Sequence, residues 1–231
     1  MKQNKIYYLL TALCVFSSTS FYSISATAAI SDVGIDYEQD TEIVPPINPM
    51  NPDETIKSDK NTAGPLSIDY ISDWNFSIQR ISSKKITYPV KKDVVETSDG
   101  QTKEVPNFFQ VTDKTGKANG WTLTVKQNNQ FQTKDRVELK GAQVIVESPI
   151  MQTFDDGDRP NIQGVVHLVP NGDAALMINA QQKQGTGTWL GVFGDEESAA
   201  EQIGLTVPGE TKKKPGIYSA TFTWTLSAGE A

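Results

Sequence analysis

The chain has very little cysteine and histidine, which excludes several kinds of active site. Its 231 residues include one of each, Cys14 and His167. Histidine-rich metal sites need more of these side chains than the sequence holds. A catalytic triad would have to use His167, and no Ser-x-Gly nucleophile elbow lies near it. A glycosidase needs only two carboxylates, and acidic residues are abundant, but no feature of the sequence marks a pair. We therefore expect a protein that is not an enzyme and that holds neither a cofactor nor a metal ion.

Positive charge is also in short supply. The 21 lysines and arginines are outnumbered by 28 acidic residues, so the formal net charge is −7. Residues 1–28 contain two lysines and no acidic residue, which leaves −9 on the rest of the chain (−7 minus 2). A chain of this charge is a poor partner for nucleic acid or an anionic membrane. Binding to an anionic surface must therefore depend on local contacts.

The sequence has no apolar run of about 20 residues, the length that a membrane-spanning helix needs. Residues 6–16 form a shorter, mostly apolar stretch that follows Lys2 and Lys5. Ala26-Thr27-Ala28 then gives the small-x-small pattern that signal peptidases accept. We predict a signal peptide over residues 1–28 and a secreted mature chain without a transmembrane segment.

Cys14 lies inside this predicted leader. The bulky Leu13 precedes it where a lipid-anchored protein has a small residue, so we favour ordinary secretion over lipid anchoring. The mature chain then contains no cysteine, and its stability must come from its core without disulfides.

Residues 29–65 are predicted to form a proline-rich, extended linker. Five of the chain's twelve prolines fall here, together with scattered acidic residues and few apolar ones. Such a segment cannot bury enough apolar surface to offset the entropy lost on ordering it. The folded domain is therefore expected over residues 66–231.

From residue 66 onward, short runs alternate between apolar and polar residues and are separated by turn signals such as Asn119-Gly120 and Asn171-Gly172. The clearest run, over residues 218–226, places aromatic and apolar residues at even positions and Ser or Thr at odd ones. A short helix is suggested only at residues 195–202. These features predict an all-β fold: an antiparallel β-sandwich or barrel-like domain after a disordered N-terminal tail.

Two identical tripeptides stand out, Trp121-Thr122-Leu123 and Trp224-Thr225-Leu226. Residues i and i+2 of a strand share a face, so each tripeptide places its Trp and its Leu together. Alternation with other apolar residues favours a core position for each Trp. A Trp ring can also stack on a sugar or a peptide, and both interpretations hold if the two motifs pack side by side and form an exposed edge.

Several segments follow one another in the order typical of a known family. They are Leu66-Ser-Ile-Asp-Tyr-Ile-Ser-Asp-Trp-Asn-Phe76, residues 110–116 with 120–125, Gly185-Thr-Gly-Thr-Trp189, and Val207-Pro-Gly209 with residues 215–226. In these segments, which include both tripeptides, residues 66–231 resemble the WxL domain of Gram-positive surface proteins.

The resemblance implies a secreted protein held non-covalently at the bacterial cell surface, with residues 66–231 binding peptidoglycan in the cell wall. Trp121, Leu123, Trp224 and Leu226 are then the candidate binding residues for peptidoglycan or a partner. No wall-sorting signal follows Leu226, which agrees with non-covalent attachment. The alternative function is that of a subunit in a multi-protein surface complex, attached through a membrane-anchored WxL-interacting protein, by strand addition at a sheet edge.

The chain departs from the family's usual pattern at two places. The family usually has Phe-Gly where this chain has Asn75-Phe76-Ser77, and Arg is common at the position of Thr115. Neither departure touches the two tripeptides.

Other polar features have ordinary explanations. Asp155-Asp-Gly-Asp158 lacks the remaining ligands of a calcium loop, so a solvated turn is favoured over a metal site. The basic run at residues 212–214 is expected at a solvated hairpin tip, with contact to an anionic wall polymer as the alternative. Trp189 lies in a Gly-rich stretch and is expected to be more exposed than the motif tryptophans.

Overall fold

The computed structural model describes residues 28–229 of the chain. The predicted signal peptide, except for its last residue, lies outside this range, as does Cys14. Residues 28–37 have no regular secondary structure and belong to a separate unit from the compact part, which begins at Glu38. The compact part contains strands β1 to β16 and one short 3-10 helix, η1 (Ala199–Glu201). All pairs between these strands are antiparallel, so the all-β prediction is confirmed.

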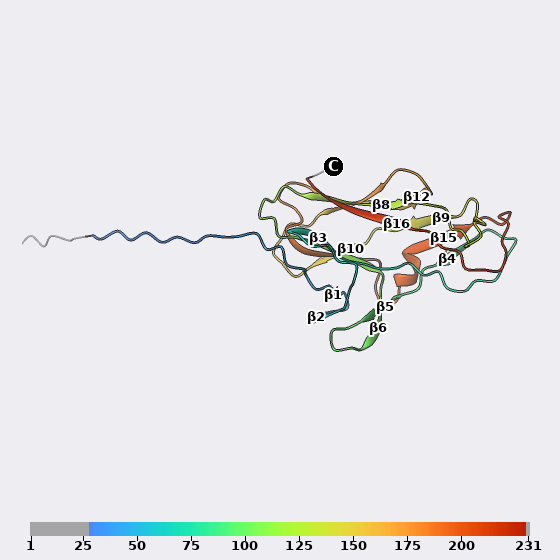
Figure 1. The fold of residues 1–231 in the computed structure, drawn as a ribbon, viewed down its shortest axis with the longest axis horizontal. Coiled ribbons are helices and arrows are strands. Elements are labelled where there is room, and N and C mark those ends of the chain that lie inside the picture. The colour runs from blue at the N-terminus through green and yellow to red at the C-terminus, as the bar shows by residue number, and fades with distance from the viewer. Residues whose placement is uncertain (1–27, 230–231) are drawn as a thin grey trace, which may run out of the picture. The chain divides into compact units, whose positions relative to one another are not determined.

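Three four-stranded sheets make up most of the fold (Figure 1). The first has the order β10-β14-β7-β3, with β10 at Ile150–Thr153, β14 at Gly187–Val192, β7 at Phe108–Asp113 and β3 at Leu66–Ile71. The second has the order β11-β13-β8-β16, with β11 at Asn161–Ile162, β13 at Ala175–Ala180, β8 at Trp121–Gln127 and β16 at Phe222–Ala228.

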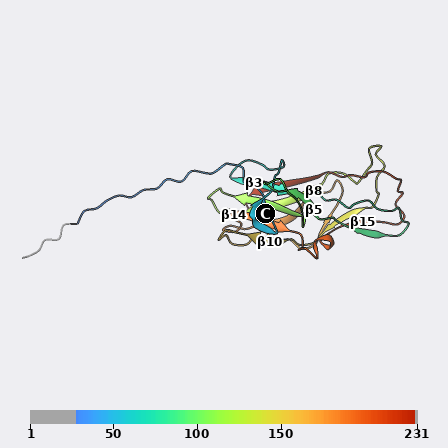
Figure 2. The same cartoon turned by 90° about the horizontal axis from the view of Figure 1, so that it is seen from below.

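The third sheet has the order β12-β9-β15-β4, with β12 at Val166–Leu168, β9 at Gln143–Val146, β15 at Ile203–Val207 and β4 at Ile86–Pro89. In both views, β15 lies toward one end of the compact part (Figures 1 and 2). Two further hairpins are formed by β1 (Ile47–Asn48) with β2 (Asn51–Thr55), and by β5 (Asp93–Glu96) with β6 (Thr102–Val105).

The alternating sequence produces the core directly. On β8, Trp121, Leu123 and Val125 are each 0% exposed and point to the same side of the sheet. They pack with apolar residues from the other two large sheets, including Phe109 of β7 and Val144 of β9. A strand that buries one face in this way fixes its register, because a slip by one residue would turn that face to solvent.

The structure differs from the predicted linker over residues 29–65. Residues 47–55 form the β1–β2 hairpin, and Ile56 is 2% exposed in a second core cluster with Tyr70 and Phe108. The extended segment therefore ends before β1. The strand pair is hard to predict because the segment is rich in proline and has few apolar residues. The neighbouring Ile56 nevertheless packs in the core.

A buried polar cluster attaches this hairpin to the first sheet. Gln110 of β7 accepts the N–H of Ile47 at 2.7 Å and donates to the carboxylate of Asp69 at 3.0 Å. Asp69 also accepts the hydroxyls of Ser67 and Thr112, both at 2.6 Å. Burial raises the pKa of Asp69, although the three hydrogen bonds act in the opposite direction. Each polar group of the cluster thus has a partner, as buried polar groups need.

Candidate functional site

The two motif strands lie side by side. Figure 1 shows β8 and β16 next to each other, and in their register Leu226 pairs with Leu123 and Trp224 pairs with Val125. The two tripeptides, 103 residues apart in the sequence (224 minus 121), are therefore neighbours in one sheet. Their Trp and Leu side chains share the inner face, while Thr223 and Thr225 on the outer face are exposed.

Trp121 is fully enclosed at its place in the middle of the sheet. Its ring is 0% exposed, and its indole N–H donates to the carbonyl of Gly185 at 2.8 Å. Gly185 has φ +74°, and a Cβ added there would lie 2.5 Å from the indole nitrogen. The Gly-rich segment at residues 185–189 therefore packs against the ring of Trp121, the first motif tryptophan, through Gly185. Enclosed in this way, Trp121 and the equally buried Leu123 offer no surface to a ligand.

Trp224 and Leu226 have a different environment, because β16 is the edge strand of its sheet. Both side chains are half-buried. The ring of Trp224 lies edge-on to Trp74, with centroids 5.8 Å apart, and at 6.1 Å from Phe109. Trp224 is therefore the motif tryptophan that combines a packed face with accessible surface. Its role in binding stays a prediction.

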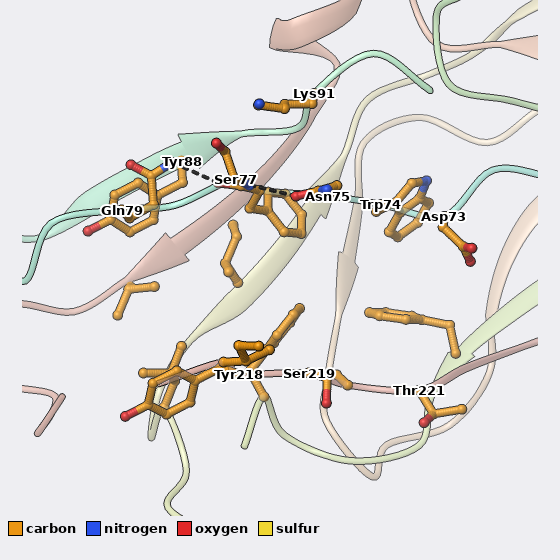
Figure 3. Close-up of a pocket in the computed structure, with 18 of the residues that line it drawn as sticks. Asp73, Trp74, Asn75, Ser77, Gln79, Tyr88, Lys91, Tyr218, Ser219 and Thr221 are labelled. Atoms are coloured by element: carbon orange, nitrogen blue, oxygen red, sulfur yellow. Dashed lines mark hydrogen bonds between the residues drawn. The ribbon is translucent and has the colours of Figure 1, made fainter. Parts of the chain in front are cut away.

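A large hollow opens beside Trp224, and we name it the aromatic groove. Its volume is about 1400 Å³. Its floor is formed by aromatic side chains from three parts of the chain: Trp74, Phe76, Phe131, Phe222 and Trp224. One wall is residues 71–81 and the other is residues 213–221, as Figure 3 shows with Trp74 and Gln79 on one side and Tyr218 and Thr221 on the other.

Exposed aliphatic side chains add to the apolar surface of the groove. Ile78 is 98% exposed, Ile217 is 87% exposed and Ile81 is 58% exposed, and all three line the groove. Large aliphatic side chains gathered at one hollow mark an interaction surface more often than scattered ones do. The sequence patterns do not predict this surface. The sequence offers only a weak signal, the isoleucines at 78 and 81, which lie outside the alternating strand runs, and nothing in it places them near Ile217.

Positive charge is concentrated at the same place. The described residues that line the groove include five basic side chains and one acidic side chain, Asp73. Asp73 pairs with Lys60 at 2.6 Å, and Lys214 pairs with Asp135 at 2.9 Å. Arg80 and Lys91 complete the charged rim together with Lys213. On a chain with a net charge of −7, the groove lining is therefore a local region of positive charge.

The basic run at residues 212–214 has a structural part as well as an exposed one. The Lys213 ammonium donates to the carbonyls of Pro208, Gly209 and Thr211 at 2.9, 3.4 and 3.1 Å. It thereby fixes the loop before the groove wall, while Lys212 and Lys214 remain exposed.

The remaining polar candidates and Trp189 are placed away from the groove lining. Asp155 accepts the backbone N–H of Thr188 at 2.6 Å, and no group of three or more His, Cys, Asp or Glu within residues 28–229 is arranged to hold a metal ion. His167 is exposed and approaches Gln143. The expectation for Trp189 is wrong: its ring is 2% exposed, because it packs in the main hydrophobic core.

The departure from the family pattern at Ser77 lies in the groove wall. Ser77 has φ +62°, in the left-handed region that favours glycine, and its N–H donates to the side chain of Asn75 at 2.8 Å (Figure 3). A serine is strained in this conformation, whereas a glycine would not be.

We predict that Ser77→Gly stabilises the protein by about 0.5–1 kcal/mol. The substitution relieves about 1–2 kcal/mol of left-handed strain and loses part of that gain to the greater freedom of glycine in the unfolded chain. Urea unfolding measures the change. Ser77→Ala is the matched control, because it removes the hydroxyl and keeps the strain. Equal stabilities for the two variants would contradict the strain at this position.

The two motif tryptophans should differ when each is replaced by alanine. Trp121→Ala is expected to lower the free energy of unfolding by about 3–5 kcal/mol, because it removes a fully buried ring and its hydrogen bond. Trp224→Ala is expected to cost about 1–3 kcal/mol, because part of that ring already contacts water. Thermal and urea unfolding of both variants provide the comparison. A Trp121→Ala variant with an unchanged melting temperature would refute the core position.

The comparison with known families gives one match. A family model described as "WxL domain surface cell wall-binding" matches residues 25–229, which is nearly the whole chain. The match begins well before residue 66 and so includes the β1–β2 hairpin within the domain. Comparison with curated proteins and with solved structures gave no match. With both motif strands paired in one sheet and the family model covering it, the chain belongs to the WxL domain surface cell wall-binding family.

Proposed function

We propose that this protein is secreted by a Gram-positive bacterium and is held non-covalently at the cell wall by binding peptidoglycan in the aromatic groove. The family supports attachment at the cell wall. The observation that carries the finer proposal is the groove itself, where the half-buried rings of Trp74 and Trp224 lie in a floor surrounded by basic side chains. No helix between residues 28 and 229 is long and apolar enough to cross a membrane.

The chemistry of the groove suits both parts of peptidoglycan. Sugar rings present apolar faces that stack on tryptophan, whose N–H can bond a sugar hydroxyl. The peptide stems of the wall carry free carboxylates, and Arg80 and Lys91 are available at the rim to bind them. The basic rim also offsets the repulsion between an acidic protein and an anionic wall, so binding should weaken only partly when salt screens the charges.

We also propose that the groove does not catalyse hydrolysis. A glycosidase needs two carboxyl groups that flank the scissile bond. Among the described residues that line the groove, the acidic one is Asp73, and it is engaged by Lys60. A wall-hydrolysis assay with the purified protein checks this proposal.

The second candidate function is that of an assembly subunit, and one observation favours it. β16 pairs with β8 on one side, and no strand among residues 28–229 pairs with its other side. A partner chain could add a strand along this edge. Attachment to the wall would then depend on the partner and not on peptidoglycan.

Sedimentation with purified peptidoglycan tests the first function. The mature protein, residues 29–231, should pellet with sacculi stripped of other wall polymers, and part of this binding should persist at high salt. Trp74→Ala should weaken binding about tenfold through the lost stacking, and Arg80→Ala should weaken it at low salt only.

Phe154→Ala is the matched control, since Phe154 is 52% exposed and does not line the groove. Melting temperatures establish that each variant is folded. Wild-type protein that stays in the supernatant with bare peptidoglycan, but pellets when a surface partner is added, would replace the first function with the second.

A further inference from the structure

We propose that residues 30–37 of a second copy of this chain add as a strand along β16 and fill the aromatic groove, so that copies assemble head to tail. The inference goes beyond wall attachment and does not depend on it. Its basis is a match between two features of the same chain, an unpaired strand edge above an apolar groove and an exposed segment with a strand pattern. We name residues 30–37 the tail segment.

The tail segment has the alternating apolar and polar sequence typical of a β-strand, although it forms no strand in the structure. Val33, Ile35 and Tyr37 alternate with Gly34 and Asp36, so the three apolar side chains would share one face of an extended chain. They are 94%, 73% and 87% exposed, and Ile30 is 95% exposed. A spacer needs no such pattern, because spacers are depleted in β-branched and aromatic residues.

The edge of β16 presents free backbone groups at the groove. Backbone hydrogen bonds from Asn128 to Thr221 and from Gly229 to Gly120 show that odd-numbered residues of this region bond toward β8. In an antiparallel pair the bonded and non-bonded positions alternate, so the N–H and C=O of Phe222 and Trp224 point to the other side. β3 lies near β16 there without pairing with it. An inserted strand would bond to these groups and cover the aromatic floor.

The opposite charges of the tail segment and the groove favour the tail segment as the ligand of the groove. Residues 29–56 contain seven acidic residues and no basic one, and Asp32 and Asp36 lie within the tail segment itself. The groove is lined by five basic residues and one acidic residue. The tail segment is acidic and has one apolar face, whereas the groove has a basic rim and an apolar floor. This complementarity favours the tail segment as the partner of the groove.

This contact joins two different surfaces, so it is heterologous and extends from copy to copy. Each groove takes the tail segment of the next copy, and the copy at one end of the series keeps an empty groove. That groove remains available to the wall. Tail segment and wall ligand would cover the same tryptophans, so they exclude each other at any one groove.

Mixing two single-cysteine proteins tests the contact between copies. The mature chain has no cysteine, so Gly34→Cys in one protein and Thr221→Cys in the other introduce unique thiols. Gly34 has open space around it and Thr221 is exposed in the groove wall. A short bismaleimide should join position 34 of one protein to position 221 of the other, as read by mass spectrometry of the linked peptides.

Gly164→Cys replaces Thr221→Cys in the control mixture, because Gly164 is exposed, unhindered and outside the groove lining. We expect the 34-to-221 product to exceed the 34-to-164 product at least tenfold and to decrease at high salt. Equal amounts of the two products would overturn the proposal. A link that forms only when both cysteines are in one chain, and not between mixed chains, would show that the segment folds back on its own groove and would also overturn it.

A pair of charge-matched variants tests the face of the tail segment. Ile35→Asp places a charge on the apolar face, whereas Gly34→Asp adds the same charge to the polar face. In analytical ultracentrifugation Ile35→Asp should weaken self-association at least about tenfold, and Gly34→Asp should weaken it much less. Equal effects, or a wild-type protein that is monomeric at every concentration, would refute the assembly.

The sedimentation assay separates this inference from wall binding. Ile35→Asp leaves every groove residue intact and frees the groove of the tail segment, so it should pellet with peptidoglycan at least as well as the wild type does. Loss of self-association with retained wall binding is the expected result. Loss of wall binding by Ile35→Asp would contradict the assignment of the tail segment to self-association alone.

Discussion

The pairing of β8 with β16 is the interaction on which the rest of the structure depends. It joins the first half of the domain to its last strand and brings the two Trp-Thr-Leu motifs into register. The same pairing places one motif in the centre of a sheet and the other at its edge. An identical tripeptide therefore has two roles: Trp121 fills the core and is fixed by Gly185, whereas Trp224 forms part of an accessible floor.

The aromatic groove lies where β16 has no neighbouring strand paired to its outer edge among residues 28–229. β3, in the first sheet, lies near β16, in the second sheet, but does not pair with it. The first and second sheets are therefore not joined by strand pairing at this edge, where the groove lies. The core is then open to solvent between residues 71–81 and 213–221. A protein that exposes aromatic side chains and free strand backbone in one place needs an occupant there, because such an edge is otherwise a site of uncontrolled association. The two occupants that we propose, a wall ligand and a strand from another copy, would each cover this surface.

Much of the fold could be predicted from the sequence, because one-sided burial leaves an alternating pattern. The runs around Trp121 and Trp224 form strands as expected, and their apolar faces point inward. The pattern indicates the strand that contains Trp189 but cannot show what packs against its ring, so the burial of this ring is known only from the fold. The β1–β2 hairpin was missed because its residues are mostly polar or proline and it is held by Gln110, a long-range partner. The groove combines distant segments, so only the folded chain reveals it.

The central claim is that β16 has a free edge above an open groove. Amide hydrogen exchange measured by NMR on the Ile35→Asp variant, whose groove stays open, tests it residue by residue. The account predicts slow exchange for the amides of Thr223 and Thr225, which bond to β8, and much faster exchange for those of Phe222 and Trp224. Equally slow exchange for all four amides would contradict the free edge and, with it, both occupants proposed for the groove.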